Sequence, residues 1–367
     1  MGGFECSTHR DGRGRRLDLI DSTQHDEFAE ADYRRLLKTG MGTARDGLRW
    51  HLIEKAPSRY DFSSAKSQIA AARKTGIQVV WDFFHYGYPD DLDIFSPEFV
   101  ERFADFSFAA TNFLKSEFDE PLLICPVNEI SFFSWVAGTA GVFYPCRRRG
   151  GGTLKRQLVR AAIASVDAIR SVSASARIVF TDPAIHVVAP QGSAAERRAA
   201  EKYRLAQFES YDMLSGRVEP ELGGAPEYLD ILGLNYYFHN QWRYPSRRKI
   251  PLGHDLYRPL NEILREFYYR YKRPMFLAET GIEDGERPSW FRYVWDEVAL
   301  ARSGGVPVQG VCLYPIVNHP GWADDRHCHN GLWDYPDADG EREIYQPLAD
   351  EIKLRAGRPT RTRPVGV

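Results

Sequence analysis

The sequence ICPVNEI, residues 124–130, has the pattern of a buried strand that ends on two polar residues. Its apolar part is continuous rather than alternating, which is typical of a parallel strand covered on both faces. Asn128 and Glu129 follow at the strand end, where α/β barrels place their catalytic groups. Taken alone, Glu129 also fits a first-turn acid of the next helix. The stretch MFLAETG, residues 275–281, repeats the pattern with Glu279, so the chain offers two strand-end glutamates.

Short apolar runs and amphipathic stretches alternate along the chain, which predicts a single (β/α)8 barrel, a TIM barrel, with its active site at the C-terminal ends of the strands. A doubly wound open sheet is the alternative, but no Gly-rich phosphate loop follows an early strand. We expect the barrel to occupy residues 1–356 and the basic segment 357–367 to be a disordered tail. The eight expected strands are Gly3–Ser7, Gly42–Gly47, Ile77–Phe84, Leu122–Asn128, Arg177–Thr181, Leu229–Tyr236, Pro274–Glu279 and Val308–Tyr314.

Helices are expected between most of these strands, because apolar residues recur there at helical spacing. Ser96 and Pro97 have the pattern of a helix start, and Gly76 that of a helix end. The other expected helices are about Asp26–Thr39, Leu154–Val172, Ala195–Leu214, Leu260–Tyr271, Ser289–Ser303 and Pro347–Leu354.

The amino-acid composition argues against some classes of function and favours others. The 367 residues carry a net charge of −2, which argues against a general partner of nucleic acids or anionic membranes. Aromatic residues make up 13% of the chain, which suits a sugar-binding cleft, although core packing would use the same residues. The five cysteines are odd in number and lack the spacing of a metal knuckle, so we expect free thiols in a reducing compartment. With no apolar signal core at the N-terminus, a cytoplasmic enzyme is expected.

Polar side chains stand at the end of every expected strand, which predicts a polar pocket at one face of the barrel. The loop after the last strand adds His319 and Trp322 to this set. The strand-end residues are His9, Arg45, His85, Asn128 with Glu129, Asp182, Asn235 with Tyr236 and Tyr237, Glu279, and Tyr314.

Two glutamates can divide the work of glycoside cleavage, since one donates a proton and the other stays ionised. Arg45 would favour the ionised form of its partner, although a buried structural ion pair is the alternative for this residue. Asn128 could donate to a sugar 2-hydroxyl, and Tyr237 could orient the nucleophile. For His85, a core histidine bonded to backbone is as plausible as a ligand contact.

These motifs together resemble the clan A glycoside hydrolases, and more narrowly family 1, the β-glucosidase-like retaining enzymes. The resemblance runs from about residue 3 to residue 334. It is carried by GTARDGLRW (42–50), FFHYGYPDDL (83–92), VNEI (127–130), LGLNYYFHN (232–240), LAETG (277–281) and the region 308–332.

The resemblance implies a β-glycosidase that retains anomeric configuration and needs no cofactor or metal. Glu129 would be the acid/base and Glu279 the nucleophile, supported by Arg45, Asn128 and Tyr237. The substrate would be a small carbohydrate or glycoside. The residues expected to bind it are His9, His85, Asn235, Tyr314, Trp322 and His319.

The sequence departs from the family pattern at positions whose side chains bind the hydroxyl groups of glucose in the family. His9 stands where the family tends to have a glutamine, and Gly321 where it has a glutamate. Ile130 replaces a proline, and Tyr314–Pro315 replaces a Trp–Ser pair. The Tyr314–Pro315 bond is a candidate cis bond that would aim Tyr314 into the pocket. We therefore expect the catalytic pair to be kept, while the sugar of the substrate need not be glucose.

Three alternatives stay open from the sequence. A transglycosylase would use the same glycosyl-enzyme with a sugar acceptor in place of water. A metal-dependent isomerase or lyase would use HPGWADDRHCH, residues 319–329, which is rich in ligand-type residues but lacks a rigid helical spacing. A carbohydrate-binding protein without catalysis would keep the pocket alone. The sequence does not indicate an oligomeric state.

Overall fold

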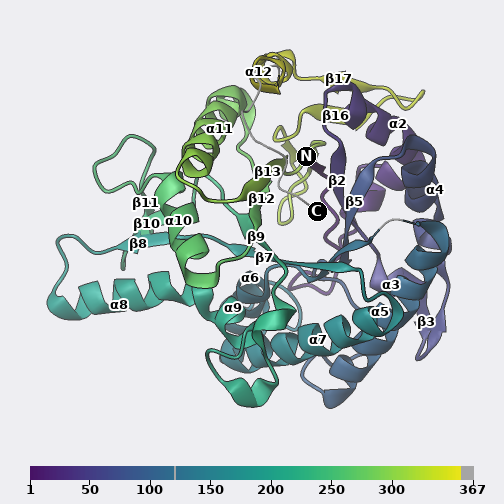
Figure 1. Ribbon diagram of the computed structural model, residues 1–367, viewed down its shortest axis with the longest axis horizontal. Helices are drawn as coiled ribbons and strands as arrows, with labels where there is room; N and C mark the ends of the chain where they lie inside the picture. The colour runs from purple at the N-terminus through teal and green to yellow at the C-terminus, as the bar shows by residue number, and fades with distance from the viewer. Residues whose placement is uncertain (120, 357–367) are drawn as a thin grey trace.

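Eight parallel strands close into a barrel at the centre of the molecule, and helices surround it (Figure 1). The computed structural model describes residues 1–119 and 121–356, so the tail expected at 357–367 lies outside the described residues. Neighbouring strands around the barrel follow the order β1-β13-β12-β9-β7-β6-β5-β2. This confirms the predicted TIM barrel. The strands are β1 Gly2–Gly3, β2 Thr43–Gly47, β5 Gln78–Phe84, β6 Leu123–Val127, β7 Arg177–Pro183, β9 Ile231–Asn235, β12 Met275–Thr280 and β13 Val308–Leu313.

The first strand is shorter than predicted, because β1 ends at Gly3 instead of Ser7. A carboxylate oxygen of Glu5 accepts a hydrogen bond from the backbone N–H of Ser7 at 2.9 Å. This local bond competes with strand pairing and turns the chain out of the ladder. Gly3 itself has no room for a side chain, since a Cβ there would lie 2.1 Å from the ring of Tyr314.

The helices lie close to their predicted positions. Helix α5 begins at Pro97, and Phe99, Phe103 and Phe106 on its buried face contact the ring of Trp50 at centroid distances of 5.7, 5.1 and 5.3 Å. The principal helices are α1 Leu19–Ser22, α2 His25–Lys38, α3 Trp50–Ile53, α4 Lys66–Thr75, α5 Pro97–Glu117, α6 Ile130–Trp135, α7 Gly151–Val172, α8 Ala194–Leu205, α9 Glu209–Leu214, α10 Leu260–Tyr271, α11 Arg287–Ser303 and α12 Gln346–Ala356.

One predicted helix is divided in two. The stretch Ala195–Leu214 was expected to be continuous, but a 3-10 turn at Ala206–Phe208 separates α8 from α9. Both Gln207 and Phe208 are buried at this turn. The Gln207 side chain accepts a hydrogen bond from the backbone N–H of Ile185 at 2.8 Å, so tertiary contacts override the helical pattern.

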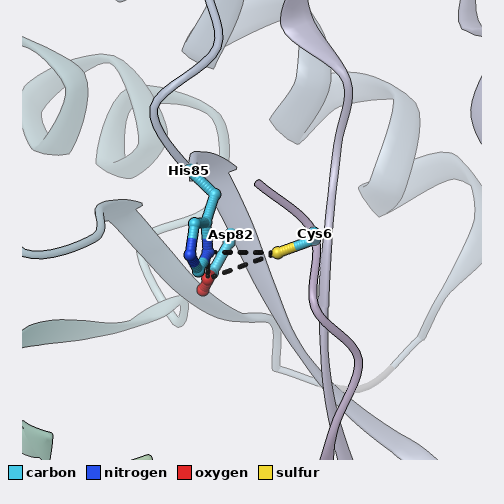
Figure 2. Close-up of side chains that lie close together, drawn as sticks. All are labelled: Cys6, Asp82 and His85. Carbon is cyan, nitrogen blue, oxygen red and sulfur yellow. Dashed lines mark hydrogen bonds and ion pairs between the residues drawn. The ribbon is translucent and has the colours of Figure 1, made fainter. Parts of the chain in front are cut away.

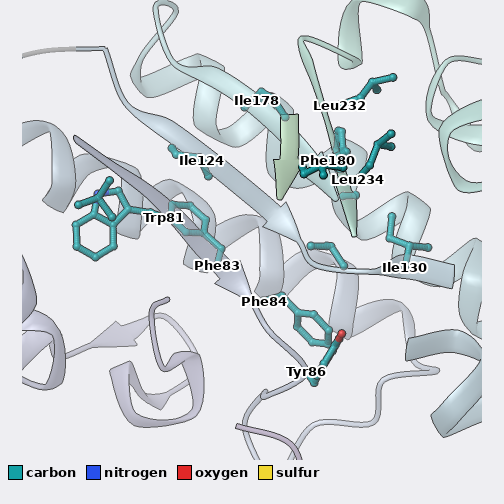
Figure 3. Close-up of a cluster of buried hydrophobic side chains, with 14 of the residues drawn as sticks. Trp81, Phe83, Phe84, Tyr86, Ile124, Ile130, Ile178, Phe180, Leu232 and Leu234 are labelled. Atoms are coloured by element: carbon teal, nitrogen blue, oxygen red, sulfur yellow. The ribbon is translucent and has the colours of Figure 1, made fainter. Parts of the chain in front are cut away.

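The barrel strands carry two apolar layers. Residues such as Trp81, Phe83 and Ile124 belong to the large core that the helices cover (Figure 3). Val80 and Cys125 belong to a separate cluster that takes residues from five adjacent strands, as expected for a barrel interior. Since both faces are buried, the strands are apolar throughout, and polar side chains on them stand out.

Smaller elements lie outside the barrel. Strands β8 His186–Val188, β10 Gln241–Arg243 and β11 Arg248–Lys249 form a small sheet beside α8, at the left of Figure 1. Among the described residues, no helix combines the length and apolar character needed to cross a membrane. The remaining strand pairs are β3 Glu54–Ala56 with β4 Arg59–Tyr60, β14 His319–Pro320 with β15 His327–Cys328, and β16 Trp333–Pro336 with β17 Arg342–Ile344.

Candidate active site

Glu129 lies two residues after the end of β6 and directly before α6, and it is buried at the barrel end. Its backbone has a positive φ of 51°, a region that non-glycine residues seldom adopt and that is often found at functional sites. One carboxylate oxygen accepts a hydrogen bond from Asn235 Nδ2 at 2.8 Å. The other accepts from the hydroxyl of Tyr86, which also has a positive φ, of 71°. Two neutral donors therefore hold Glu129.

Glu279 lies at the end of β12 and has a different set of partners. Arg45 Nη1 donates to one of its carboxylate oxygens at 2.7 Å, forming a buried ion pair. The hydroxyl of Tyr237 donates to the other oxygen at 2.8 Å. A cation and a neutral donor therefore hold this second glutamate, and together they fix both of its oxygens.

Arg45 is fully buried on β2 and connects Glu279 to Asp82 and Asn128. Asp82, inside β5, accepts from Arg45 Nε at 3.1 Å and from Nη2 at 2.7 Å. Asn128 Oδ1 accepts from Nη2 at 2.6 Å and from Thr181 Oγ1 at 2.6 Å. Although burial opposes its ionised form, Arg45 and His85 hold the pKa of Asp82 below its ordinary value. The guanidinium is thus fixed from several sides.

The two glutamates differ in how their surroundings act on the proton. Burial, reinforced by the negative charge of Glu279, raises the pKa of Glu129 well above the ordinary glutamate value. Burial also raises the pKa of Glu279, but Arg45 and His85 oppose that shift. An adjacent cation favours the ionised carboxylate, and burial favours the protonated acid. Glu129 is therefore more suited to be the proton donor, and Glu279 is more suited to be the ionised carboxylate.

His85, Asp82 and Cys6 lie together beneath this network (Figure 2). His85 Nδ1 is 2.9 Å from Asp82 Oδ2, and Asn128 Nδ2 is 3.1 Å from His85 Nε2, so the imidazole bridges these two side chains. Cys6 Sγ is 3.1 Å from His85 Nδ1, and burial raises the pKa of this thiol well above its ordinary value.

The same three side chains have ligand atoms close enough to share a metal ion. However, Arg45 already binds both oxygens of Asp82, and its positive charge would repel a second cation at this distance. The donor set therefore fits a support for Arg45 better than it fits a metal centre.

Aromatic rings form the outer wall of the site. His9 is stacked on Phe143 at a centroid distance of 3.7 Å and lies edge-on to Trp322 at 5.3 Å. Tyr86, the donor to Glu129, lies 6.2 Å from Trp322. Both ring nitrogens of His9 and Nε1 of Trp322 are buried without a hydrogen-bond partner among the described residues. Burial lowers the pKa of His9 to about 3, so this imidazole is neutral. These buried atoms are free to form hydrogen bonds with a ligand or with water.

No protein-family model and no curated protein sequence matches this chain. Solved structures do match. A family 1 β-glucosidase from Thermotoga maritima is 17% identical over 90% of this chain and 86% of that one, with a TM-score of 0.74. The fold is that of the family 1 β-glucosidases.

A second structure with this β-glucosidase fold is the virulence factor SghA from Agrobacterium tumefaciens. In complex with its substrate analog salicin, it is 18% identical over 91% of this chain and 85% of that one, with a TM-score of 0.76. At these identities the similarity establishes the fold, and the resemblance found in the sequence is confirmed at that level. The reaction must be inferred from the site.

The β-glucosidase fold brings most of the sequence-predicted site residues into one hydrogen-bonded or ring-stacked group. The predicted catalytic residues Arg45, Asn128, Glu129, Tyr237 and Glu279 are all members. The group also contains five of the predicted substrate-binding residues. Asn235 donates to Glu129, and His85 accepts from Asn128. The ring of Tyr314 lies 5.2 Å from the guanidinium of Arg45, and His9 and Trp322 belong to the aromatic wall. The Tyr314–Pro315 bond is cis.

His319 is the exception. Its Nε2 is 3.1 Å from Asn330 Nδ2, and its Nδ1 is 2.8 Å from the carbonyl oxygen of Pro320. Within the described residues, no hydrogen bond, ion pair or ring contact joins it to the glutamates. Farther along the same loop, His327, His329 and Asp334 have ligand-type atoms close together, and all three are at least partly exposed.

Asp82 and Tyr86 are members of the site that the sequence reading did not single out. Asp82 had a usable signal, because it is the one charged residue in the strand QVVWDFF and a buried charge needs a partner. Tyr86 had none, since nothing in the sequence separates it from Tyr88 two residues later.

Proposed function

We propose that this protein is a retaining β-glycoside hydrolase, with Glu129 as acid/base and Glu279 as nucleophile. One observation carries the proposal: two buried glutamates at strand ends have opposite electrostatic partners. Glu279 is paired with Arg45, whereas Glu129 has only the neutral donors Tyr86 and Asn235. Double displacement requires this division between an ionised and a protonated carboxyl group.

In the first step, Glu279 attacks the anomeric carbon and forms a C–O bond to it. The glycosidic C–O bond breaks at the same time, and its electron pair goes to the leaving oxygen, which takes the proton of Glu129. In the second step, ionised Glu129 removes a proton from water. The water oxygen bonds to the anomeric carbon, and Glu279 leaves as a carboxylate. Two inversions at this carbon retain its configuration.

The surrounding residues support these steps. Arg45 and Tyr237 bind separate oxygens of Glu279 and would hold it in one orientation for attack. The amide of Asn128 lies 3.0 Å from Tyr86 Oη and 3.1 Å from His85 Nε2, so a sugar 2-hydroxyl would replace one of these contacts. The two carboxyl groups of a retaining pair are expected to lie about 5–5.5 Å apart.

The substrate is proposed to be a small glycoside whose sugar need not be glucose, because His9 and Gly321 replace the glucose-reading groups of the family. The partly unpartnered aromatic wall at His9 and Trp322 suits a sugar ring. All five cysteines are free thiols, which is consistent with the reducing environment of a cytoplasmic enzyme.

A screen of aryl α- and β-glycosides of several sugars tests the proposal. We expect turnover of β-glycosides only, with first-formed sugar of β configuration when proton NMR follows the reaction. Activity should persist after treatment with a chelator. Turnover restricted to α-glycosides, or a product of inverted configuration, would contradict the assignment.

A further inference from the structure

A third carboxylate, Glu5, faces the same site and has no role in the proposed cleavage. It follows β1 by two residues, and its side chain is only 5% exposed. Oε1 accepts a hydrogen bond from the backbone N–H of Ser7 at 2.9 Å and lies 3.8 Å from His85 Nε2. Oε2 has no hydrogen-bond partner within the part of the chain that the structure describes.

The charge balance around Glu5 is unusual for a buried acid. Arg45 is the cation of the site, and it is already shared by Asp82 and Glu279. Within the described residues, no Arg or Lys side chain pairs with Glu5, and the basic group that lies near it is the imidazole of His85, at 3.8 Å. A buried carboxylate without a cation is costly, because burial removes the solvation that stabilises its charge. Glu5 therefore has room for a cationic partner on its Oε2 side.

Glu5 also lies near the catalytic pair, because His85 Nε2 is 3.8 Å from Glu5 Oε1 and 3.1 Å from the amide nitrogen of Asn128, the residue before Glu129. Its strand, β1, is three strands away from β6, so Glu5 and Glu129 lie on different sides of the barrel end. Burial is the main cause of the raised pKa values of Glu279, Tyr237 and Tyr86, and the nearby Glu5 carboxylate adds to each shift, as expected for groups that lie near one another.

The chain that follows Glu5 has further polar atoms without partners. Ser7 Oγ and both ring nitrogens of His9 are buried and unpaired among the described residues. Three residues at alternate positions after β1, namely Glu5, Ser7 and His9, therefore have unused hydrogen-bonding capacity in buried positions. Such a concentration is typical of a surface that is completed by a polar ligand.

We propose that Glu5 binds an amino group on the sugar, so that the preferred substrates are β-glycosides of amino sugars. An ammonium group supplies the cation that Glu5 lacks and donates charge-assisted hydrogen bonds to its free oxygen. A hydroxyl group in the same place would donate one neutral hydrogen bond and leave the negative charge uncompensated. This inference rests on the proposed glycosidase function, because it takes the sugar to lie between Glu5 and the catalytic pair.

The test compares 4-nitrophenyl β-glucoside with its 3-amino, 4-amino and 6-amino deoxy analogues at pH 6, where the amines are protonated. We expect one amino glycoside to exceed the parent in kcat/KM by about tenfold or more, chiefly through KM. Glu5→Gln should bring that ratio close to one. Glu283→Gln, which alters an exposed ion pair with Arg326, should leave the ratio unchanged.

Binding measured by calorimetry separates this inference from the proposed function. Glu279→Gln should bind the favoured amino glycoside about tenfold more tightly than the parent, and Glu5→Gln/Glu279→Gln should not. If no glycoside is hydrolysed but this binding preference is present, the proposed hydrolysis fails and the role of Glu5 stands. If the wild-type protein hydrolyses and binds the parent at least as well as every amino analogue, the role of Glu5 is wrong and the hydrolysis stands.

Discussion

Glu129 and Glu279 are the same residue type at the ends of two strands of one barrel, yet their surroundings differ. Glu279 contacts a buried guanidinium, and Arg45 is itself held by Asp82 and by Asn128. Glu129 contacts a phenol and an amide, and no cation pairs with it in the part of the chain that the structure describes. The comparison shows that the roles of acid and nucleophile are assigned by neighbouring side chains and not by the glutamates themselves.

The backbone differs as well. Glu279 continues β12, whereas Glu129 has left its strand and takes a left-handed conformation before α6. Its N–H still donates to the carbonyl oxygen of Thr181 at 2.9 Å, which holds this strained residue in place. Each glutamate is thus fixed by a different part of the fold, so the two environments can be altered separately.

The largest effect is expected for Glu279→Gln, which removes the nucleophile while keeping its shape. Turnover of aryl β-glycosides should fall by at least about 10⁴-fold, as is found when the nucleophile of a covalent mechanism is lost. Steady-state kinetics measure this, and Glu283→Gln is the matched control, because Glu283 is four residues away and, among the described residues, forms its ion pair with the half-exposed Arg326. Equal losses in both variants would show that the effect is not specific to Glu279.

Glu129→Ala removes the proton donor and is expected to depend on the leaving group. Hydrolysis of glycosides with poor leaving groups should fall by about 10²–10⁴-fold. Glycosides with acidic phenols should be much less affected in the first step, and added azide should restore turnover by attacking the glycosyl-enzyme. A uniform loss for all leaving groups, without rescue by azide, would assign Glu129 a structural role.

Arg45→Gln tests whether the positive charge of Arg45 causes the difference between Glu279 and Glu129. Breaking a buried ion pair by removing one partner costs about 3–5 kcal/mol, so the melting temperature should fall. Without its cation the pKa of Glu279 should rise, and since Glu279 must be ionised to attack, the acid limb of the pH–rate profile should move to higher pH.

Arg49→Gln is the matched control for stability. Arg49 is also buried and pairs with Asp18 at 3.2 Å and Asp26 at 2.7 Å, but it does not contact either glutamate. It should lower stability without moving the pH profile. The same displacement of the acid limb in both variants would break the link between Arg45 and Glu279.

The smallest effects are expected from two single hydroxyl deletions that act on different limbs. Tyr237→Phe removes a donor to ionised Glu279, so its pKa should rise and the acid limb should move to higher pH. Tyr86→Phe removes a donor to Glu129, so the pKa of Glu129 should rise and the alkaline limb should move to higher pH. A bond to a charged group corresponds to about one pH unit for each limb. If either variant moves the opposite limb, the two roles are exchanged.

The barrel was predictable from the sequence because its strands are buried on both faces. Runs such as ICPVNEI begin with a continuous apolar stretch and end on polar residues, and this pattern marks β5, β6, β7, β9 and β12, whereas β2 carries Arg45 and Asp46 within it. The end of β1 was not predictable in this way. It depends on a side-chain bond from Glu5 to the Ser7 backbone, which apolar periodicity does not reveal.

The two glutamates and Arg45 were also accessible from the sequence, because they lie in or next to expected barrel strands and belong to the motifs that carry the family resemblance. The second carboxylate on Arg45, Asp82, and the phenol on Glu129, Tyr86, were not singled out. His319 was grouped with the substrate residues because it lies in the loop after β13, but its contacts are with Pro320 and Asn330. Contacts of loop residues were predicted least well, because a loop has no periodic sequence pattern that would indicate which residues it lies against.

The most direct test of the central claim is to trap the glycosyl-enzyme and locate it. Wild-type protein would be incubated with a 2-deoxy-2-fluoro glycoside that has a good leaving group, digested, and mapped by mass spectrometry. The account predicts one sugar per protein molecule, attached to Glu279, and faster labelling in wild type than in Arg45→Gln. A label on Glu129, or an active protein that never forms a covalent adduct, would contradict it.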